Sequence, residues 1–198
     1  FFFFFYDVTI LTTNFQLHLE SIQSDLVKVG RLSEKVTIRN IFTDLYDSVA
    51  GNQIPGPEIC HDYEDLLLHI NNKNVQILDK KARIFDKDGL YSNFIQYHKN
   101  GSIHFIDYMN KIDFNDLQKR YVFYKGRLLS LDTFKNNEKI QQVIYNQERQ
   151  PILNLWHKNN QVSRIFDMRS GKVTESTINL VVKDWLKTFI KADDVVLI

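Results

Sequence analysis

Six histidines are the side chains in this sequence best suited to bind a metal ion or to move a proton. His98 and His104 flank the dipeptide Asn100-Gly101, which is typical of a two-residue hairpin loop. With that loop, Tyr97 pairs with His104, and the two imidazoles point to opposite faces of the hairpin. A metal ion needs its nitrogen ligands to converge within about 2.1 Å, so this pair predicts no shared metal site.

The remaining reactive side chains form no constellation either. His61 and His69 are too far apart along a helix to share one ion, and His18 and His157 have no local partner. Cys60 adjoins His61, but adjacent residues of an extended chain point to opposite sides. The seven glycines are too scattered to form a phosphate-binding loop. We therefore expect no catalytic residue, no cofactor site and no metal site in this chain.

The composition excludes several classes of function. With 25 basic and 24 acidic residues the net charge is +1, so no strong field attracts nucleic acid. The single cysteine cannot form an internal disulfide, which favours a cytoplasmic location and leaves peripheral membrane association open. The run Phe1 to Phe5 is far shorter than the roughly 20 residues of a membrane span, so we expect no such span.

The first 50 residues show the pattern of a parallel α/β unit. A short apolar strand surrounds Val8 to Leu11, a helical period follows it, and Gly30 ends that helix. A second buried strand or strand-like run is predicted from five apolar residues: Val36, Ile38, Ile41, Phe42 and Leu45. The order strand, helix, strand is the crossover that builds a parallel sheet.

Residues 74–176 show strand runs separated by turn residues. The turn pairs are mostly about 10–12 residues apart, as in an antiparallel meander. They are Asp88-Gly89, Asn100-Gly101, Lys125-Gly126, Asn136-Asn137, Asn159-Asn160 and Ser170-Gly171.

A helical pattern returns near the end of the chain, with Trp185 on its apolar stripe, and the strand Val195 to Ile198 follows. The predicted fold class is α+β, with a long antiparallel β-meander inserted into an incomplete Rossmann-like α/β half domain. We assign residues 1–50 to a Rossmann-like segment, 51–73 to a linker with a short helix and 74–176 to the meander. The returning helix and strand occupy residues 177–198.

Apolar side chains occupy both faces of the hairpin around Asn100-Gly101. We expect one face to carry Tyr91, Ile95, Tyr97, Ile106 and Tyr108, and the other to carry Leu90, Phe94, Ile103, Phe105 and Met109. Either the sheet curls on itself, or one face meets another protein or a ligand. We predict that the first of these two sets is a partner interface, because aromatic residues supply large contact areas.

Several segments together resemble one known family. They are Val8 to Thr12, Asp25 to Gly30, Val36 to Asp47, Tyr121 to Gly126, and Trp185-Leu186 with Asp194 to Ile198. In order and pattern they resemble the N-terminal part of Gram-positive retaining glycosyltransferases built from two Rossmann domains. This family includes poly(glycerol-phosphate) α-glucosyltransferases, and N-acetylglucosaminyltransferases that act on wall teichoic acid or on serine-rich-repeat adhesins.

The resemblance implies an acceptor- or partner-binding and oligomerisation module. The complete enzyme would transfer a hexose or N-acetylhexosamine from a UDP-sugar to protein Ser/Thr or to teichoic acid. Family members open with a strand and a glycine-containing loop where this sequence has Phe1 to Phe5. They continue into a second Rossmann domain that holds the nucleotide sugar, so we expect this chain alone to be inactive. The expected partners are a second copy or a companion glycosyltransferase subunit. An alternative is a free-standing β-repeat module that binds carbohydrate or cell wall.

Overall fold

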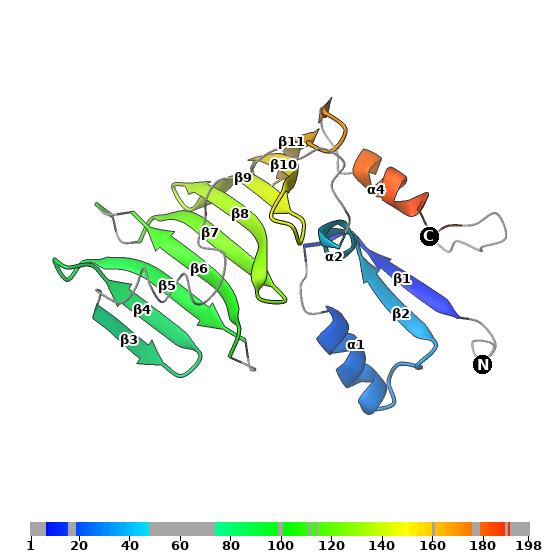
Figure 1. The fold of residues 1–198 in the computed structure, drawn as a ribbon, viewed down its shortest axis with the longest axis horizontal. Helices are drawn as coiled ribbons and strands as arrows, with labels where there is room; N and C mark the ends of the chain where they lie inside the picture. Colours follow the sequence, from blue (N-terminus) through cyan, green and yellow to red (C-terminus); the bar gives the residue numbers. More distant parts are fainter. Residues whose placement is uncertain are drawn as a thin grey trace. The chain divides into compact units, whose positions relative to one another are not determined.

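The structure is a computed structural model, and it describes residues 7–15, 19–47, 74–98, 101–110, 112–113, 115–159, 161–175, 179–188 and 190 (Figure 1). The chain divides into two compact units. One contains Phe1–Ser48 and Ile178–Ile198, and the other contains Val49–Thr177. Cys60, the helix expected in the linker and the strand expected at Val195 to Ile198 lie outside the described residues.

The first unit contains the expected strand-helix-strand crossover. Strand β1 (Val8–Thr12) pairs in parallel with β2 (Val36–Asn40), and α1 (Leu19–Lys28) connects them. Helix α1 ends where expected, because Gly30 adopts a φ of +69°. The amide of Gly30 donates to the carbonyl of Val27 at 3.0 Å, and the amide of Arg31 donates to that of Leu26 at 2.9 Å. This pair of hydrogen bonds is the Schellman arrangement.

The prediction of one strand-like run from Val36 to Leu45 is wrong in its second half. The strand stops at Asn40, and helix α2 (Ile41–Tyr46) begins directly after it. Asn40 is the reason, because its side-chain oxygen accepts from the amide of Phe42 at 2.9 Å and caps the helix. The Asn40 side-chain amide donates to the hydroxyl of Thr12 at 2.8 Å, which fixes the cap to β1.

The last described helix, α4 (Asn179–Leu186), returns to the first unit as predicted. The indole Nε1 of Trp185 donates to Oδ2 of Asp44 in α2 at 2.8 Å, and Nε of Arg39 donates to the same oxygen at 3.0 Å. One carboxylate therefore joins β2, α2 and α4. None of the helices in the described ranges is long and apolar enough to cross a membrane.

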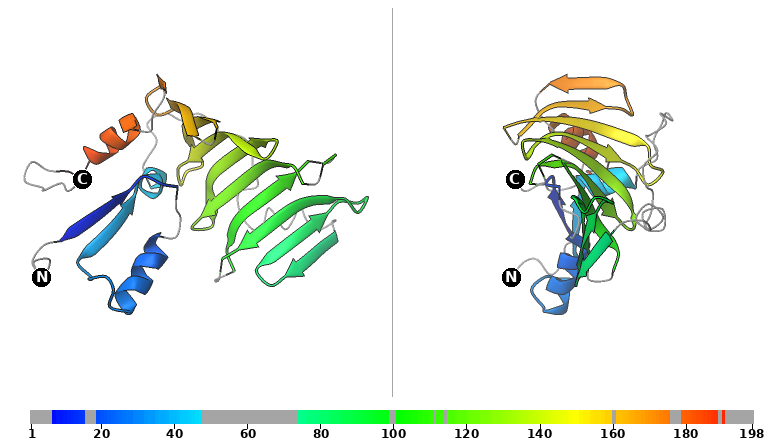
Figure 2. Two further views of the ribbon diagram at one scale, coloured as in Figure 1. Left: turned by 180° about the vertical axis from the view of Figure 1, so that it is seen from behind. Right: turned by 90° about the vertical axis from the view of Figure 1, so that its left-hand side faces the viewer.

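The second unit contains a ten-stranded antiparallel sheet in which the order of the strands is the order of the chain (Figures 1 and 2). Its strands are β3 (Asn74–Leu78), β4 (Lys81–Phe85), β5 (Tyr91–Tyr97), β6 (Ile103–Met109), β7 (Leu117–Tyr124), β8 (Arg127–Lys135), β9 (Glu138–Tyr145), β10 (Pro151–Lys158), β11 (Gln161–Asp167) and β12 (Lys172–Glu175). The predicted α+β fold with a long meander is confirmed.

The turn residues explain why the sheet is a meander. Lys125 and Gly126 have φ of 51° and 77°, and Asn136 and Asn137 have φ of 52° and 60°. Positive φ at both central residues is what a two-residue hairpin loop requires. The sequence prediction named no turn pair at three of the connections, namely Asp79-Lys80, the connection between β6 and β7, and residues 146–150. In the last of these, the side-chain oxygen of Asn146 accepts from two backbone amides and so holds the turn without a glycine.

The pairing register aligns residues across all ten strands, and we call each such line a rung. The apolar rung is Ile77, Ala82, Ile95, Ile106, Tyr121, Leu131, Val143, Asn154, Phe166 and Val173. The charged rung is Gln76, Arg83, Phe94, Asp107, Arg120, Asp132, Gln142, Leu155, Ile165 and Thr174. Because these lines are adjacent, they lie on opposite faces of the sheet.

Candidate functional site

The hairpin that joins β5 and β6 differs from the predicted two-residue loop. The register shifts at Gln96/Tyr97, so Tyr97 pairs with Ile103 rather than with His104. The loop therefore extends from His98 to Ser102, and the His98 amide closes it by donating to the Ser102 carbonyl at 2.8 Å. The extra residue is a β-bulge, which alternation along a strand cannot foresee.

This bulge overturns the predicted placement of two histidines. The rings of His98 and His104 are stacked with their centroids 4.6 Å apart, so the imidazoles do not lie on opposite faces. The ring of His104 also contacts that of Phe105 edge-on at 5.1 Å. Within the described residues, no group of three or more His, Cys, Asp or Glu side chains is arranged to hold a metal ion.

Four of the five predicted interface residues share one face. Ile95 and Ile106 are 1% and 2% exposed and belong to the core cluster of the sheet. Tyr97 and Tyr108 are half-buried and pack against that cluster. The ring of Tyr108 lies 5.0 Å from that of Tyr121. From outside, a partner reaches the tyrosines and not the isoleucines beneath them.

The placement of Tyr91 and Ile103 needs correction. A register shift at Ile84/Phe85 pairs Tyr91 with Phe85, and their rings lie 5.8 Å apart. Ile84 belongs to the core cluster with Ile95, so the next residue, Phe85, lies on the opposite face, which is that of the charged rung. Tyr91 pairs with Phe85 and therefore lies on the same face as Phe85 and not beside Ile95. Ile103 moves the other way, since it is buried in the core cluster with Ile95. Bulges move both residues to the face opposite the predicted one.

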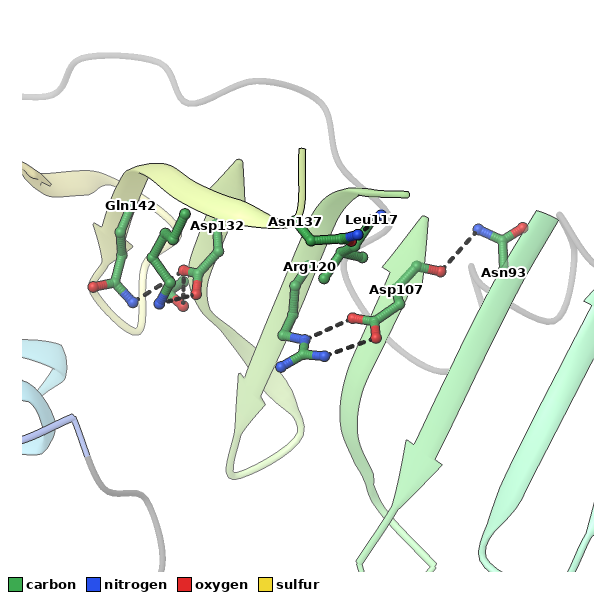
Figure 3. A network of polar contacts seen from close by, with 9 residues as sticks. Asn93, Asp107, Leu117, Arg120, Asp132, Asn137 and Gln142 are labelled. Atoms are coloured by element: carbon green, nitrogen blue, oxygen red, sulfur yellow. Dashed lines mark hydrogen bonds and ion pairs between the residues drawn. The ribbon is translucent and has the colours of Figure 1, made fainter. Parts of the chain in front are cut away.

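The face opposite the tyrosines, on which Phe94 and Phe105 are expected, is not purely apolar, because the charged rung crosses it (Figure 3). Arg120 on β7 donates two hydrogen bonds to Asp107 on β6, from Nε at 2.6 Å and from Nη2 at 2.8 Å. The guanidinium also lies over the ring of Phe105, 4.2 Å from its centroid. The hydrogen bond to Asp107 raises the pKa of Arg120. The Asp107 side chain is 10% exposed, so the carboxylate is largely shielded from water, whereas the Arg120 side chain is 34% exposed.

Asp132 on β8 is the second charged centre of this rung. Its Oδ1 accepts from Oγ of Ser130 at 3.1 Å and from Nε2 of Gln142 at 3.0 Å (Figure 3). Its Oδ2 pairs with Nζ of Lys139 at 2.5 Å. Every oxygen of this buried carboxylate therefore has a donor. The contacts to Gln142 and Lys139 join β8 to β9 and so help to fix the pairing of these two strands.

His157 on β10 has a buried Nε2 without a hydrogen-bond partner. Burial lowers the pKa of His157, and the nearby positive charge of Lys139 lowers it further, while Asp132 acts in the opposite direction. The imidazole is therefore held neutral near pH 7.

The charged rung is the feature that the sequence reasoning missed. Asp107, Arg120 and Asp132 are separated by a dozen or more residues in sequence, so no local motif marks them. They become neighbours only when the turns fix the register of three consecutive strands. A one-residue slip would move these side chains to the opposite face, so the rung specifies the register.

The sheet and its flanking unit are similar to parts of larger proteins of known structure. A mutant TarM of S. aureus, solved with fondaparinux, α-GlcNAc-glycerol and UDP, matches 92% of this chain at a TM-score of 0.64 and 20% identity. The chain has the fold of one region of these proteins. The pneumococcal O-GlcNAc transferase GtfA, solved with UDP and GlcNAc, matches 90% of this chain at a TM-score of 0.58 and 16% identity. A Glycosylation Associate Protein (Gap123) complex from Streptococcus agalactiae matches 92% of this chain at a TM-score of 0.61 and 14% identity.

The chain spans about a third of the length of these proteins, namely 36% of the TarM chain, 34% of GtfA and 35% of the Gap123 chain. No protein-family model matches the sequence, and no curated protein matches it. At identities of 14–20% the likeness establishes a common fold. It confirms the resemblance in architecture that the order of the segments predicted.

Proposed function

We propose that this chain is the acceptor- or partner-binding and assembly module of a glycosyltransferase. The observation that supports it is the fold, which extends over 92% of the chain and is shared with TarM. The complete protein would transfer a hexose or N-acetylhexosamine from a UDP-sugar to protein Ser/Thr or to teichoic acid. We propose that the site for the UDP-sugar donor lies in the rest of a longer gene product, and that the present chain is inactive by itself. We propose a cytoplasmic location for the protein.

The proposed contact surface is the tyrosine face of the meander. Tyr97 and Tyr108 are half-buried, and beneath them lie Ile95 and Ile106, which hold the rings in place. A tyrosine has few rotors, so a ring fixed in this way loses little entropy when a partner covers it. On the other face, the Asp107–Arg120 and Asp132–Lys139 pairs keep the strands in register. This combination suits a rigid platform for a second copy, a companion subunit or an acceptor.

The direct test is a transfer assay on this chain and on the longer gene product, with UDP-sugars and both acceptor classes. We expect transfer by the longer protein alone. Light scattering after size exclusion should show a self-associated species or a stable complex with a companion subunit. Replacing Tyr97 and Tyr108 with Ser should weaken the assembly or the acceptor binding, whereas Phe at both positions should preserve it. Transfer by the short chain alone, or a monomer that binds no companion or acceptor, would contradict the proposal.

A second candidate is a carbohydrate-binding module, favoured by the aromatic groups on the charged-rung face. The rings of Phe94 and Phe105 lie 6.0 Å apart, and Arg120 stacks over Phe105. Rings beside a guanidinium offer a stacking surface and donors to a sugar. Binding of cell-wall glycan by the present chain, lost in Phe94→Ser but retained in the double Tyr→Ser variant, would favour this candidate over the first.

A further inference from the structure

The two edges of the ten-stranded sheet differ in how they are protected from pairing with another strand. One edge strand is β12, whose sequence KVTE contains two charged residues, and charges in an edge strand discourage edge-to-edge association. The opposite edge strand, β3, has the sequence NVQIL, with no charge and no proline. All five of its residues are exposed, and Ile77 is 76% exposed. An exposed edge without charge or proline, in which three of five residues are apolar, is a template for another strand.

The hairpin geometry determines which backbone groups of β3 point outward. The Asp79-Lys80 loop joins β3 to β4, and Leu78 pairs with Lys81 next to it. The residues that close a two-residue loop form a hydrogen-bonded pair, so Leu78, Gln76 and Asn74 bond toward β4. Val75 and Ile77 therefore direct their N–H and C=O groups away from the sheet. In the described part of the chain no strand pairs with that side.

We propose that β3 pairs with β3 of a second copy of this chain, antiparallel, about a two-fold axis that passes through Gln76. In this register Val75 of each copy lies opposite Ile77 of the other. Both are outward-bonding positions, so each of these two pairs forms two backbone hydrogen bonds. The Gln76 residues face one another as a pair without backbone hydrogen bonds. The result is a sheet that continues through both copies.

The side chains support a second copy as the occupant, rather than a strand of another protein. Val75 and Ile77 share the face of the apolar rung, so the pairing brings four β-branched side chains together and extends that rung across the axis. In a two-fold pair of strands, identical residues lie near the axis, so a charged residue there would be repelled by its copy. Strand β3 has no charged residue, so it can pair with itself and needs no complementary strand from another protein.

This inference deepens the assembly role proposed above and rests on it. Ile77→Lys places two like charges beside the axis and removes two apolar side chains from the new cluster. We expect light scattering to show that the mass of the wild-type dimer falls by half in this variant, with an unchanged circular dichroism spectrum. The matched control is Ile112→Lys, since Ile112 is 92% exposed and follows β6, which is three strands away from β3 in the sheet. We expect this variant to remain dimeric.

A second variant tests the register without weakening the edge. In a Cys60→Ser background, Gln76→Cys should form an intermolecular disulfide on mild oxidation, because facing residues without backbone hydrogen bonds lie about 4.5 Å apart between Cα atoms. Val173→Cys on β12 is the control, since Val173 is 61% exposed on the opposite edge, and it should remain largely uncrosslinked.

The outcomes separate the two proposals. Loss of the dimer in Ile77→Lys together with crosslinking of Gln76→Cys supports β3 pairing. An oligomer that survives Ile77→Lys, or that crosslinks through Val173→Cys, overturns β3 pairing and leaves the assembly role in place. A chain that stays monomeric, fails to crosslink through Gln76→Cys and binds no companion or acceptor overturns both. A monomer whose β3 instead pairs with a strand of a companion protein overturns the second copy as occupant.

Discussion

The ion pair between Asp107 and Arg120 should carry a measurable part of the stability of the sheet. The variant Arg120→Met keeps a side chain of similar length over the Phe105 ring but removes the positive charge. It leaves the Asp107 carboxylate, which is 10% exposed, without its charged donor. Breaking a buried pair typically costs 3–5 kcal/mol, and because Arg120 itself is 34% exposed, water will offset part of this. Loss of the cation–π contact adds about 0.5 kcal/mol, so we expect a total loss of about 2.5 kcal/mol.

Urea unfolding at pH 7, followed by circular dichroism, measures this loss. With a slope of about 2 kcal/mol per molar urea, the midpoint should fall by about 1.2 M. The matched control is Arg83→Met, because Arg83 stands on the same rung, is exposed and forms no ion pair in the described part of the chain. We expect its midpoint to shift by less than about 0.25 M, within the range of ordinary surface substitutions.

A double variant decides whether the pair or the isolated charge is responsible. Asp107→Leu combined with Arg120→Met removes both charges, and replacing a buried pair with apolar residues is often nearly neutral. We therefore expect the double variant to lose less than about 1 kcal/mol and to be more stable than Arg120→Met alone. If the two single losses simply add, or if Arg120→Met unfolds at the wild-type midpoint, our interpretation of the charged rung is refuted.

Three further predictions concern other parts of the chain. Gly30→Ala should destabilise the protein by about 1 kcal/mol in urea unfolding, because Gly30 has a φ of +69° although a Cβ would meet nothing within 4 Å. Asp44→Ala in a Trp156→Phe background, where Trp185 is the single tryptophan, removes the acceptor that holds α4 against α2. Water should then reach the Trp185 ring, which is 6% exposed, and shift its fluorescence to longer wavelength. His157 has a lowered pKa in the folded chain, so unfolded chains bind the extra proton first. Stability should decline as the pH falls below about 6.5, and His157→Phe should reduce that slope, whereas a slope that stays the same would exclude His157 as its source.

The parts of the fold that the sequence predicts are those set by local chemistry. A pair such as Lys125-Gly126 or Asn136-Asn137 needs no distant residue to adopt positive φ, so the meander follows from its turns. Gly30 ends a helix for the same reason. Asn40 shows the limit of pattern reading, because the apolar spacing that follows it suits a strand as well as a short buried helix. The side-chain cap decides for the helix.

The candidate surfaces are less predictable because they depend on pairing between strands. The sequence places Ile95 and Ile106 on the correct common face, since the register around them is regular. It places Tyr91 and Ile103 on the wrong faces, because one extra residue in a strand reverses the alternation beyond it. The pair of Asp107 and Arg120 is hard to predict for the same reason, because it too depends on the pairing of strands. The two residues are recognisable as a pair only after the hairpins on both sides of β6 have been placed.

The agreement between strand order and chain order has a consequence for how this protein can change. Each strand of the meander bonds only to the strands before and after it in the sequence, as in a solenoid of repeats. Contacts between near neighbours close quickly during folding, because little chain entropy is lost for each one. During evolution the sheet could therefore gain or lose one hairpin at a time at either edge. The interior strands would keep their pairing partners, while the new edge strand would present different side chains.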